Sequence, residues 1–211
     1  MSCEKVEKGQ ELLLAIEKGE IERAKSLIEA GADVNGVNES KCTALFHAVR
    51  KGYTDIALAL INNGADLSKK NVNGNTALMS AVTYCDHGKK DMVTILINAG
   101  ADVNTKMTGS GYTALMEASE RGYTDIAISL IQAEADVNMQ NRDGETALMI
   151  AAQHENRKTL AKALIYAGAF LIIRDRNGET ALDHALNPEI RNALHRFNSD
   201  AECADYSDDS D

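Results

Sequence analysis

Three adjacent residues, Cys85, Asp86 and His87, carry the side chains from which a thiol nucleophile site could be built. In such a site a histidine takes the proton of the cysteine, and the thiolate attacks the substrate. The chemistry needs a base within about 3 Å of the sulfur, together with a pocket and oxyanion donors. Neighbouring residues in a loop do not supply these by themselves. A thiol-dependent enzyme is therefore the remote alternative to a surface loop insertion.

A metal site is the second chemistry that Cys85 and His87 could support, with a third ligand from elsewhere. No second cluster lies at the spacing of a structural zinc site, and the four cysteines form no Cys-x-x-Cys pair. No Gly-x-x-x-x-Gly-Lys-Ser/Thr phosphate loop occurs. The sequence therefore predicts no catalytic residue, no cofactor and no metal ion. Scattered cysteines indicate reduced thiols in an intracellular, cytoplasmic protein.

The charge and hydropathy of the chain argue against two classes of partner. The net charge is −10, and six acidic residues lie in the segment 198–211, which has no Lys or Arg. A nucleic-acid-binding surface needs clustered Lys and Arg, so none is expected. No run of about 18 apolar residues is present, and residues 1–9 lack the apolar core of a signal peptide, so no membrane span is expected.

A repeated motif, Gly-x-Thr-Ala-Leu, sets the elements that must position every candidate residue. Its threonines, and those of a looser first copy, are Thr43, Thr76, Thr113, Thr146 and Thr180, at spacings of 33, 37, 33 and 34 residues. Periods of this length indicate an array of stacked units. A threonine at this position can cap a helix, because its hydroxyl accepts a hydrogen bond from a free backbone N–H of the first turn.

Each repeat contains two short amphipathic helices. In the second repeat, apolar residues follow Thr43 at helical spacing up to Gly52, and a second helix starts near Thr54 and ends at Gly64. Helices of two to three turns do not persist alone in water. The repeats must therefore bury their apolar faces against each other.

The motifs Gly-x-Thr-Ala-Leu-x-x-Ala, Gly-x-x-Asp-Ile and Gly-Ala-Asp-Val-Asn resemble the ankyrin repeat over about nine-tenths of the chain. The resemblance implies an all-α solenoid of six helix-pair repeats with β-hairpin-like loops, the first and last repeats acting as caps. We place the repeats at 10–37, 38–70, 71–107, 108–140, 141–174 and 175–197. Residues 1–9 are expected to be frayed and the acidic residues 198–211 to be disordered.

The resemblance also implies a non-catalytic module that binds a partner protein through its hairpin tips and the first helix of each repeat. The residues at these positions differ between repeats, as expected of a variable surface on a fixed scaffold. Tyr and Arg are favoured among them because both are frequent at interface hot spots. The candidates are Arg50, Lys51, Asn73, Asn75, Tyr84, Tyr112, Glu120, Arg121, Arg142, Asp143, Glu145, His154 and Arg176. The alternative setting is a pathogen or symbiont protein that acts on a host protein.

Two departures from the repeat pattern stand out. Glu134 replaces the glycine that ends the second helix, so it either strains a left-handed position by about 1 kcal/mol or forces another turn. Residues 169–172 replace Ala-Asp-Val-Asn, so that Phe170 and Ile172 stand in place of Asp and Asn, Leu171 takes the buried Val position, and Ile173 extends the apolar run. This run either forms an exposed apolar patch or packs under the adjacent loop or the C-terminal repeat. We expect a monomer, with self-association through residues 170–173 as the alternative.

Overall fold

The structure is a computed structural model that describes residues 3–84 and 90–204, and within them it is all-α. The proposed Cys85, Asp86 and His87 site and residues 205–211 of the acidic tail lie outside these residues. The described helices are α1 (Cys3–Lys18), α2 (Ile21–Glu29), α3 (Ala44–Lys51), α4 (Thr54–Asn62), α5 (Ala77–Thr83), α6 (Lys90–Asn98), α7 (Ala114–Arg121), α8 (Thr124–Gln132), α9 (Ala147–Ala152), α10 (Lys158–Tyr166), α11 (Ala181–His184) and α12 (Pro188–Ala204).

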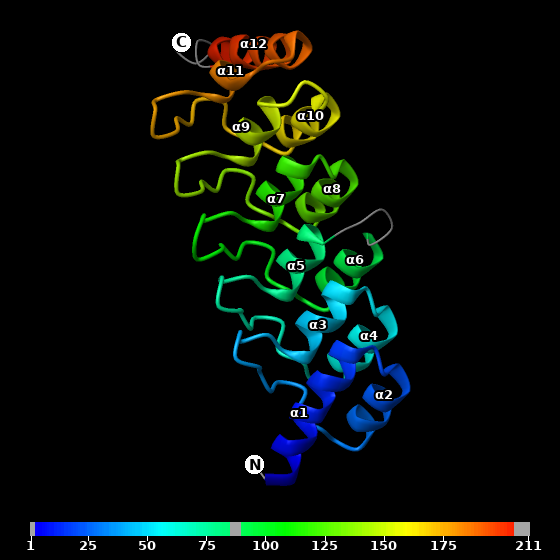
Figure 1. The fold of residues 1–211 in the computed structure, drawn as a ribbon. Coiled ribbons are helices and arrows are strands. Elements are labelled where there is room, and N and C mark those ends of the chain that lie inside the picture. Colours follow the sequence, from blue (N-terminus) through cyan, green and yellow to red (C-terminus); the bar gives the residue numbers. More distant parts are fainter. Residues whose placement is uncertain (1–2, 85–89, 205–211) are drawn as a thin grey trace, which may run out of the picture. The chain divides into compact units, whose positions relative to one another are not determined.

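The chain forms two compact halves, Met1–Gly109 and Ser110–Asp211. In the N-terminal half, helices pair as α1 with α2, α3 with α4 and α5 with α6, and α3 packs against both α1 and α5. In the C-terminal half, α9 packs against α7 and α11, and α10 against α8 and α12. Figure 1 shows the loops of each half leaving its helices on one side. The all-α stacking of helix pairs that the sequence predicts is confirmed.

Each of the five repeated threonines stands at the N-cap of the first helix of its repeat. Four of them accept a hydrogen bond from the backbone N–H three residues later, at 3.2–3.4 Å, namely Thr43, Thr76, Thr113 and Thr146. In the last copy Asp183 stands where the earlier copies have Phe or Met. There the backbone N–H and the hydroxyl of Thr180 both donate to the Asp183 carboxylate, at 2.8 Å. The Thr180 hydroxyl thus donates its hydrogen bond, whereas the hydroxyls of the earlier threonines accept one.

In three of the hairpins, an Asn or Asp at the start holds the tip closed. The Oδ1 atom of Asn141 accepts the N–H groups of Asp143 and Glu145, both at 2.9 Å. Asn71 and Asp175 make the equivalent pairs of bonds in their hairpins. One isolated bridge, Val37 with Thr43, is the sole β-type pairing among the described residues. The loops are therefore hairpin-like turns closed by side chains.

The Asn of the Gly-Ala-Asp-Val-Asn motif joins one repeat to the next. Asn138 donates to the Gly168 carbonyl at 3.2 Å and accepts the Phe170 N–H at 2.7 Å. Asn35 makes the same two contacts, with Gly64 and Asp66. The joint explains why this polar residue recurs at the end of the motif.

The ends of the chain differ from the sequence expectation. Helix α1 begins at Cys3, where a frayed segment was expected, because it packs on the first hairpin: the Asp33 N–H donates to the Lys5 carbonyl at 3.2 Å. Helix α12 runs to Ala204, past the expected boundary at 197. Its predicted start is confirmed, since Asn187 Oδ1 accepts the Glu189 N–H at 2.7 Å. The boundaries between repeats stay a prediction.

Glu134 keeps the left-handed conformation of the glycine that it replaces. Its φ is +64°, and its N–H donates to the Ile131 carbonyl at 3.0 Å. The equivalent glycines, Gly31, Gly64, Gly100 and Gly168, have φ between +75° and +88°. Glu134 therefore has the strained left-handed conformation and does not form another turn.

Candidate protein-binding surface

In the C-terminal half, most of the predicted contact residues lie on the ends of α7 and α9 and on the hairpins between the helix pairs. The exposed ones are Glu120, Arg121, Arg142, Asp143 and Arg176, and the half-buried ones are Tyr112, Glu145 and His154. A bond between backbone groups joins the last two hairpins, since the Arg176 N–H donates to the Asp143 carbonyl at 2.9 Å. The hairpin tips therefore form a continuous edge.

Tyr112 lies among carboxylates. Burial, and then the negative charges of Glu120, Glu145, Glu117 and Asp143, raise the pKa of its hydroxyl to about 12. The four acidic side chains come from α7 and from the hairpin that precedes α9. The phenol stays protonated at neutral pH and can donate a hydrogen bond.

Arg157, from the next repeat, binds the end of α7, although the sequence did not predict it as a contact residue. Arg157 donates to the Glu120 carbonyl at 2.9 Å and lies directly over Gly122. A cation at a helix C-terminus complements the helix dipole. His154, from the same loop, lies 3.8 Å from the Glu120 carboxylate. Thus the candidates Glu120 and His154 are neighbours, and Arg157 positions the first of them.

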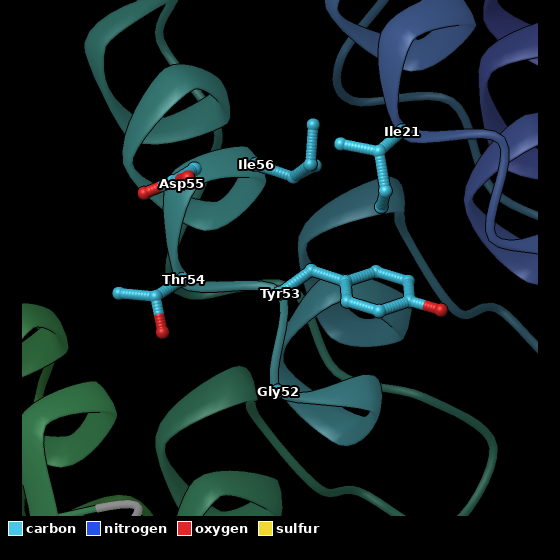
Figure 2. Close-up of a pocket in the computed structure, with 6 residues that line it drawn as sticks. All are labelled: Ile21, Gly52, Tyr53, Thr54, Asp55 and Ile56. Carbon is cyan, nitrogen blue, oxygen red and sulfur yellow. The ribbon is translucent and has the colours of Figure 1, made fainter.

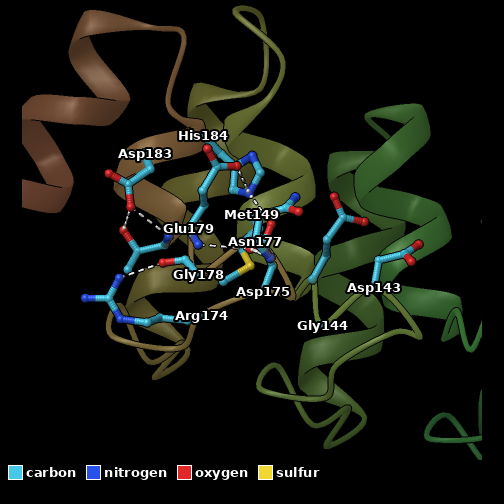
Figure 3. A network of polar contacts seen from close by, with 12 residues as sticks. Asp143, Gly144, Met149, Arg174, Asp175, Asn177, Gly178, Glu179, Asp183 and His184 are labelled. Atoms are coloured by element: carbon cyan, nitrogen blue, oxygen red, sulfur yellow. Dashed lines mark hydrogen bonds and ion pairs between the residues drawn. The ribbon is translucent and has the colours of Figure 1, made fainter.

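A polar network extends from the hairpin before α9 to α11. Glu145 accepts from Asn141 and from Gln153, both at 2.8 Å, and Gln153 in turn contacts His184 Nδ1 at 3.3 Å. His184 Nε2 lies 3.0 Å from Asp175 Oδ2, and Figure 3 shows these groups with Glu179 and Asp183 around the last hairpin. The candidate Glu145 is therefore held in place on two sides.

Gln153 and His184 belong to this network, although the sequence did not predict them as part of it. The repeat itself contains a usable signal, because His184 and His47 both occupy the second position after Thr-Ala-Leu. Those two histidines are the ones that contact a hairpin Asn or Asp, at 3.1 Å for His47 and Asn38. What no single repeat reveals is the Gln153 contact, because it joins two repeats.

In the N-terminal half, the predicted contact residues lie at the ends of the first helices and on one hairpin. Arg50, Lys51, Asn73 and Tyr84 are exposed, at the ends of α3 and α5 and on the hairpin 71–75. Asn75 is half-buried, and its Oδ1 atom has no hydrogen-bond partner among the described residues.

His47 is a buried titratable residue of the N-terminal half. It is 3% exposed, and the Nε2 atom of its ring lies 3.1 Å from Asn38 Nδ2 and 3.3 Å from Glu17 Oε1. Burial lowers the pKa of the imidazole, and the nearby Glu17 carboxylate only partly opposes this effect. The ring is consequently a packed, neutral part of the scaffold.

Phe170 and Ile172 are 63% and 80% exposed. The alternative in which they pack under an adjacent loop is therefore wrong for both. Leu171, expected in the buried Val position, is half-buried, as is Ile173. The segment leaves two large apolar side chains in solvent.

A surface pocket in the N-terminal half has a mainly apolar centre. It is lined by Ile21, Gly52, Tyr53, Thr54, Asp55 and Ile56. Figure 2 shows Ile21 and Ile56 pointing toward one another beside Tyr53, while Thr54 and Asp55 point away. Such a pocket lacks the convergent polar groups that orient a substrate.

One described cluster has the composition of a metal site. Single ligand atoms of Asp175, Glu179 and His184 lie within 4.8 Å of one another. His184 Nε2, the nitrogen that a metal would need, faces Asp175 Oδ2 at hydrogen-bond distance. The cluster is thus built as a hydrogen-bonded carboxylate–imidazole pair.

None of the described helices is both long and apolar enough to cross a membrane.

The sequence matches a known protein family. A family model for ankyrin repeats, built of three copies, matches residues 12–107, 68–141 and 115–203. No curated protein matches the sequence. The matched segments together span all six predicted repeats.

Proposed function

Since the chain belongs to the ankyrin repeat family, we propose that it is a non-catalytic module that binds a partner protein through its hairpin tips and first helices. Ankyrin repeats generally mediate protein–protein interaction, and the family is typically non-catalytic. The proposal for this chain goes further, because it assigns the contact to named residues.

One observation carries the proposal: the repeated Thr-Ala-Leu motif is buried, and most of the tip positions that vary are exposed. Thr113 and Thr146 and the Ala-Leu pairs that follow them are buried in the C-terminal half. The tip positions that change between repeats, such as Asp143 and Arg176, are exposed. Selection for folding alone explains the first group. A partner would explain the particular mixture of Tyr, Arg and acidic residues in the second.

The C-terminal half is the better candidate for the main contact. Its tips carry Arg142 and Arg176, and its inner surface carries Tyr112 among carboxylates. A half-buried tyrosine is a typical interface anchor, because it combines a large apolar area with a hydroxyl donor. The bonds that hold Glu145 keep this surface ordered before binding, which reduces the entropy cost of association.

Affinity capture with mass spectrometry tests the proposal. We expect the wild-type chain to retain a specific protein, and the variant Tyr112→Ala/Arg142→Ala/Arg176→Ala to lose it, with affinity reduced at least ~100-fold. The matched control is Gln132→Ala/Thr159→Ala, at exposed positions of α8 and α10, which should bind as the wild type does. Equal capture by the tip variant and the control, with both folded, contradicts the proposed surface.

The exposed apolar pair Phe170 and Ile172 supports a second contact, with the partner or with another copy of the chain. The variant Phe170→Asp/Ile172→Asp separates these uses. Loss of partner affinity indicates the first, and a shift from dimer to monomer in sedimentation indicates the second. A variant that keeps both full affinity and the wild-type association state shows that the pair takes part in neither.

The setting of the interaction follows from the partner that is captured. A partner from the protein's own cell favours an intracellular adaptor, whereas one from a host cell favours the effector alternative. The thiol alternative is tested separately: a Cys85→Ala variant that keeps every assayable activity of the chain rules it out.

A further inference from the structure

A chain of hydrogen bonds connects the last repeat to the hairpin tip of the repeat before it. Asn141 and Gln153 both donate to Glu145, at 2.8 Å. Gln153 Nε2 also lies 3.3 Å from His184 Nδ1, and His184 Nε2 lies 3.0 Å from Asp175 Oδ2. We name this set of five residues the relay; its His184 end is drawn in Figure 3.

The direction of each bond in the relay follows from its Glu145 end. An ionised carboxylate can only accept, so Gln153 must present its NH2 group to Glu145. The second hydrogen of that NH2 group then points at His184, so Nδ1 of the neutral ring accepts. The ring proton is left on Nε2, where it is donated to Asp175. Neutral His184 is therefore the Nε2–H tautomer.

The charged groups around His184 come from three elements. The last hairpin contributes Asp175 and Glu179. Helix α11 contributes Asp183, which lies beside Arg174. Helix α12 contributes Arg191, which donates to the Ala185 carbonyl. Glu145 faces the ring through Gln153, and α9 itself has no ionisable side chain. The Glu179 backbone N–H and the His184 bond lower the pKa of Asp175, so this carboxylate is ready to accept from His184 in either state of the ring.

We propose that protonation of His184 reverses its link to Gln153 and disconnects Glu145 from the relay. The proton, taken from solvent, binds at Nδ1 and faces the Gln153 NH2 group, so two donors oppose each other. A half-turn of the amide presents its oxygen to His184 instead. That oxygen then faces Glu145, and two acceptors oppose each other. Glu145 loses this bond and keeps only the one from Asn141.

The consequence is a pH-sensitive coupling between α11 and the tip of the hairpin 141–145. Histidine is the side chain that ordinarily changes charge between pH 5 and 8. When His184 is protonated, Glu145 is held on one side only, and its carboxylate can swing toward solvent. Glu145 also belongs to the surface proposed above to bind a partner, but the coupling is a property of the free chain and stands without that proposal.

Nuclear magnetic resonance on the full chain tests the coupling. Long-range proton–nitrogen spectra at pH 8 should show His184 as the Nε2–H tautomer. As the pH is lowered to 5, the side-chain NH2 signals of Gln153 and the carboxylate carbon of Glu145 should shift with the midpoint of His184. The Nδ1–H tautomer at pH 8, or Gln153 and Glu145 signals that stay in place while His184 titrates, overturns the proposal.

Two variants locate the titrating group. His184→Gln should abolish the shifts of Gln153 and Glu145, whereas His154→Gln, the matched control from the same half, should leave them unchanged. The reverse outcome assigns the effect to His154 and contradicts the proposal. The tautomer measurement uses the wild-type chain, so it decides the matter even if His184→Gln does not fold.

Discussion

Glu134 has a left-handed backbone conformation, which is unfavourable for a residue that carries a side chain. Its φ is +64°, in the left-handed region where a Cβ atom is strained. We expect Glu134→Gly to raise the free energy of unfolding by about 1 kcal/mol, measured by urea denaturation. Glu134→Ala is the control, because it removes the side chain and keeps the Cβ. A gain in stability from alanine as large as that from glycine would show that the strain is not in the backbone.

Gly122 has a second reason to be glycine besides its φ of +71°. A Cβ atom there would collide with the guanidinium of Arg157, whereas Gly168, with φ +88°, has open space around it. Gly168→Ala should cost about 1–2 kcal/mol of stability from the backbone alone. Gly122→Ala should cost more, because it also displaces Arg157 from the Glu120 carbonyl.

A double-mutant cycle measures the part of the Gly122→Ala cost that comes from displacing Arg157. If Arg157 causes the excess, Gly122→Ala should cost the same as Gly168→Ala once Arg157→Ala is already present. Equal costs of the two glycine substitutions in the wild-type background would contradict the contact.

At the scale of elements, the packing of α3 against the first hairpin makes the N-terminal half sensitive to acid. Burial lowers the pKa of His47 below its ordinary value of about 6.5. Between these two pKa values the unfolded chain binds more protons than the folded one, so stability must fall as the pH drops below about 6.5. The contribution is fully present above that pH.

The variant His47→Gln tests this dependence. Glutamine does not titrate, so stability measured by denaturation from pH 8 to 5 should fall less in the variant than in the wild type. Parallel curves for the two proteins would mean that His47 titrates equally in both states.

The helices and hairpins also show which structural features could be predicted from the sequence. The threonine caps and the hairpin Asn and Asp residues act within five residues of chain, so each repeat contains the information for them. The start of α1 at Cys3 depends on Asp33, and the joint at Asn138 depends on Gly168. Contacts between repeats are not visible in the period of any one of them, so the start of α1 ahead of residue 10 could not be predicted from the sequence.

At the scale of the whole molecule, each half should open from its ends. In the C-terminal half, α9 lies against both α7 and α11, and all of its residues are buried. Helix α11 is four residues long and has one fully buried residue. We expect hydrogen exchange to be slowest in α9 and faster in α11, since stacked repeats are stabilised by their neighbours. Equal protection of α9 and α11, read by mass spectrometry, would contradict this gradient.

The sequence by itself determined the class of fold, because a motif repeated every 33 to 37 residues states the same local instructions in each repeat. It also pointed to the tips and first helices, since those positions vary. Only the tertiary structure decided that Phe170 and Ile172 are exposed, that Glu134 is left-handed, and that Glu145, Gln153 and His184 form one network. The physical reason is that hydrogen bonds and burial across a repeat boundary depend on how two repeats stack, and that information is spread over residues about 30 positions apart.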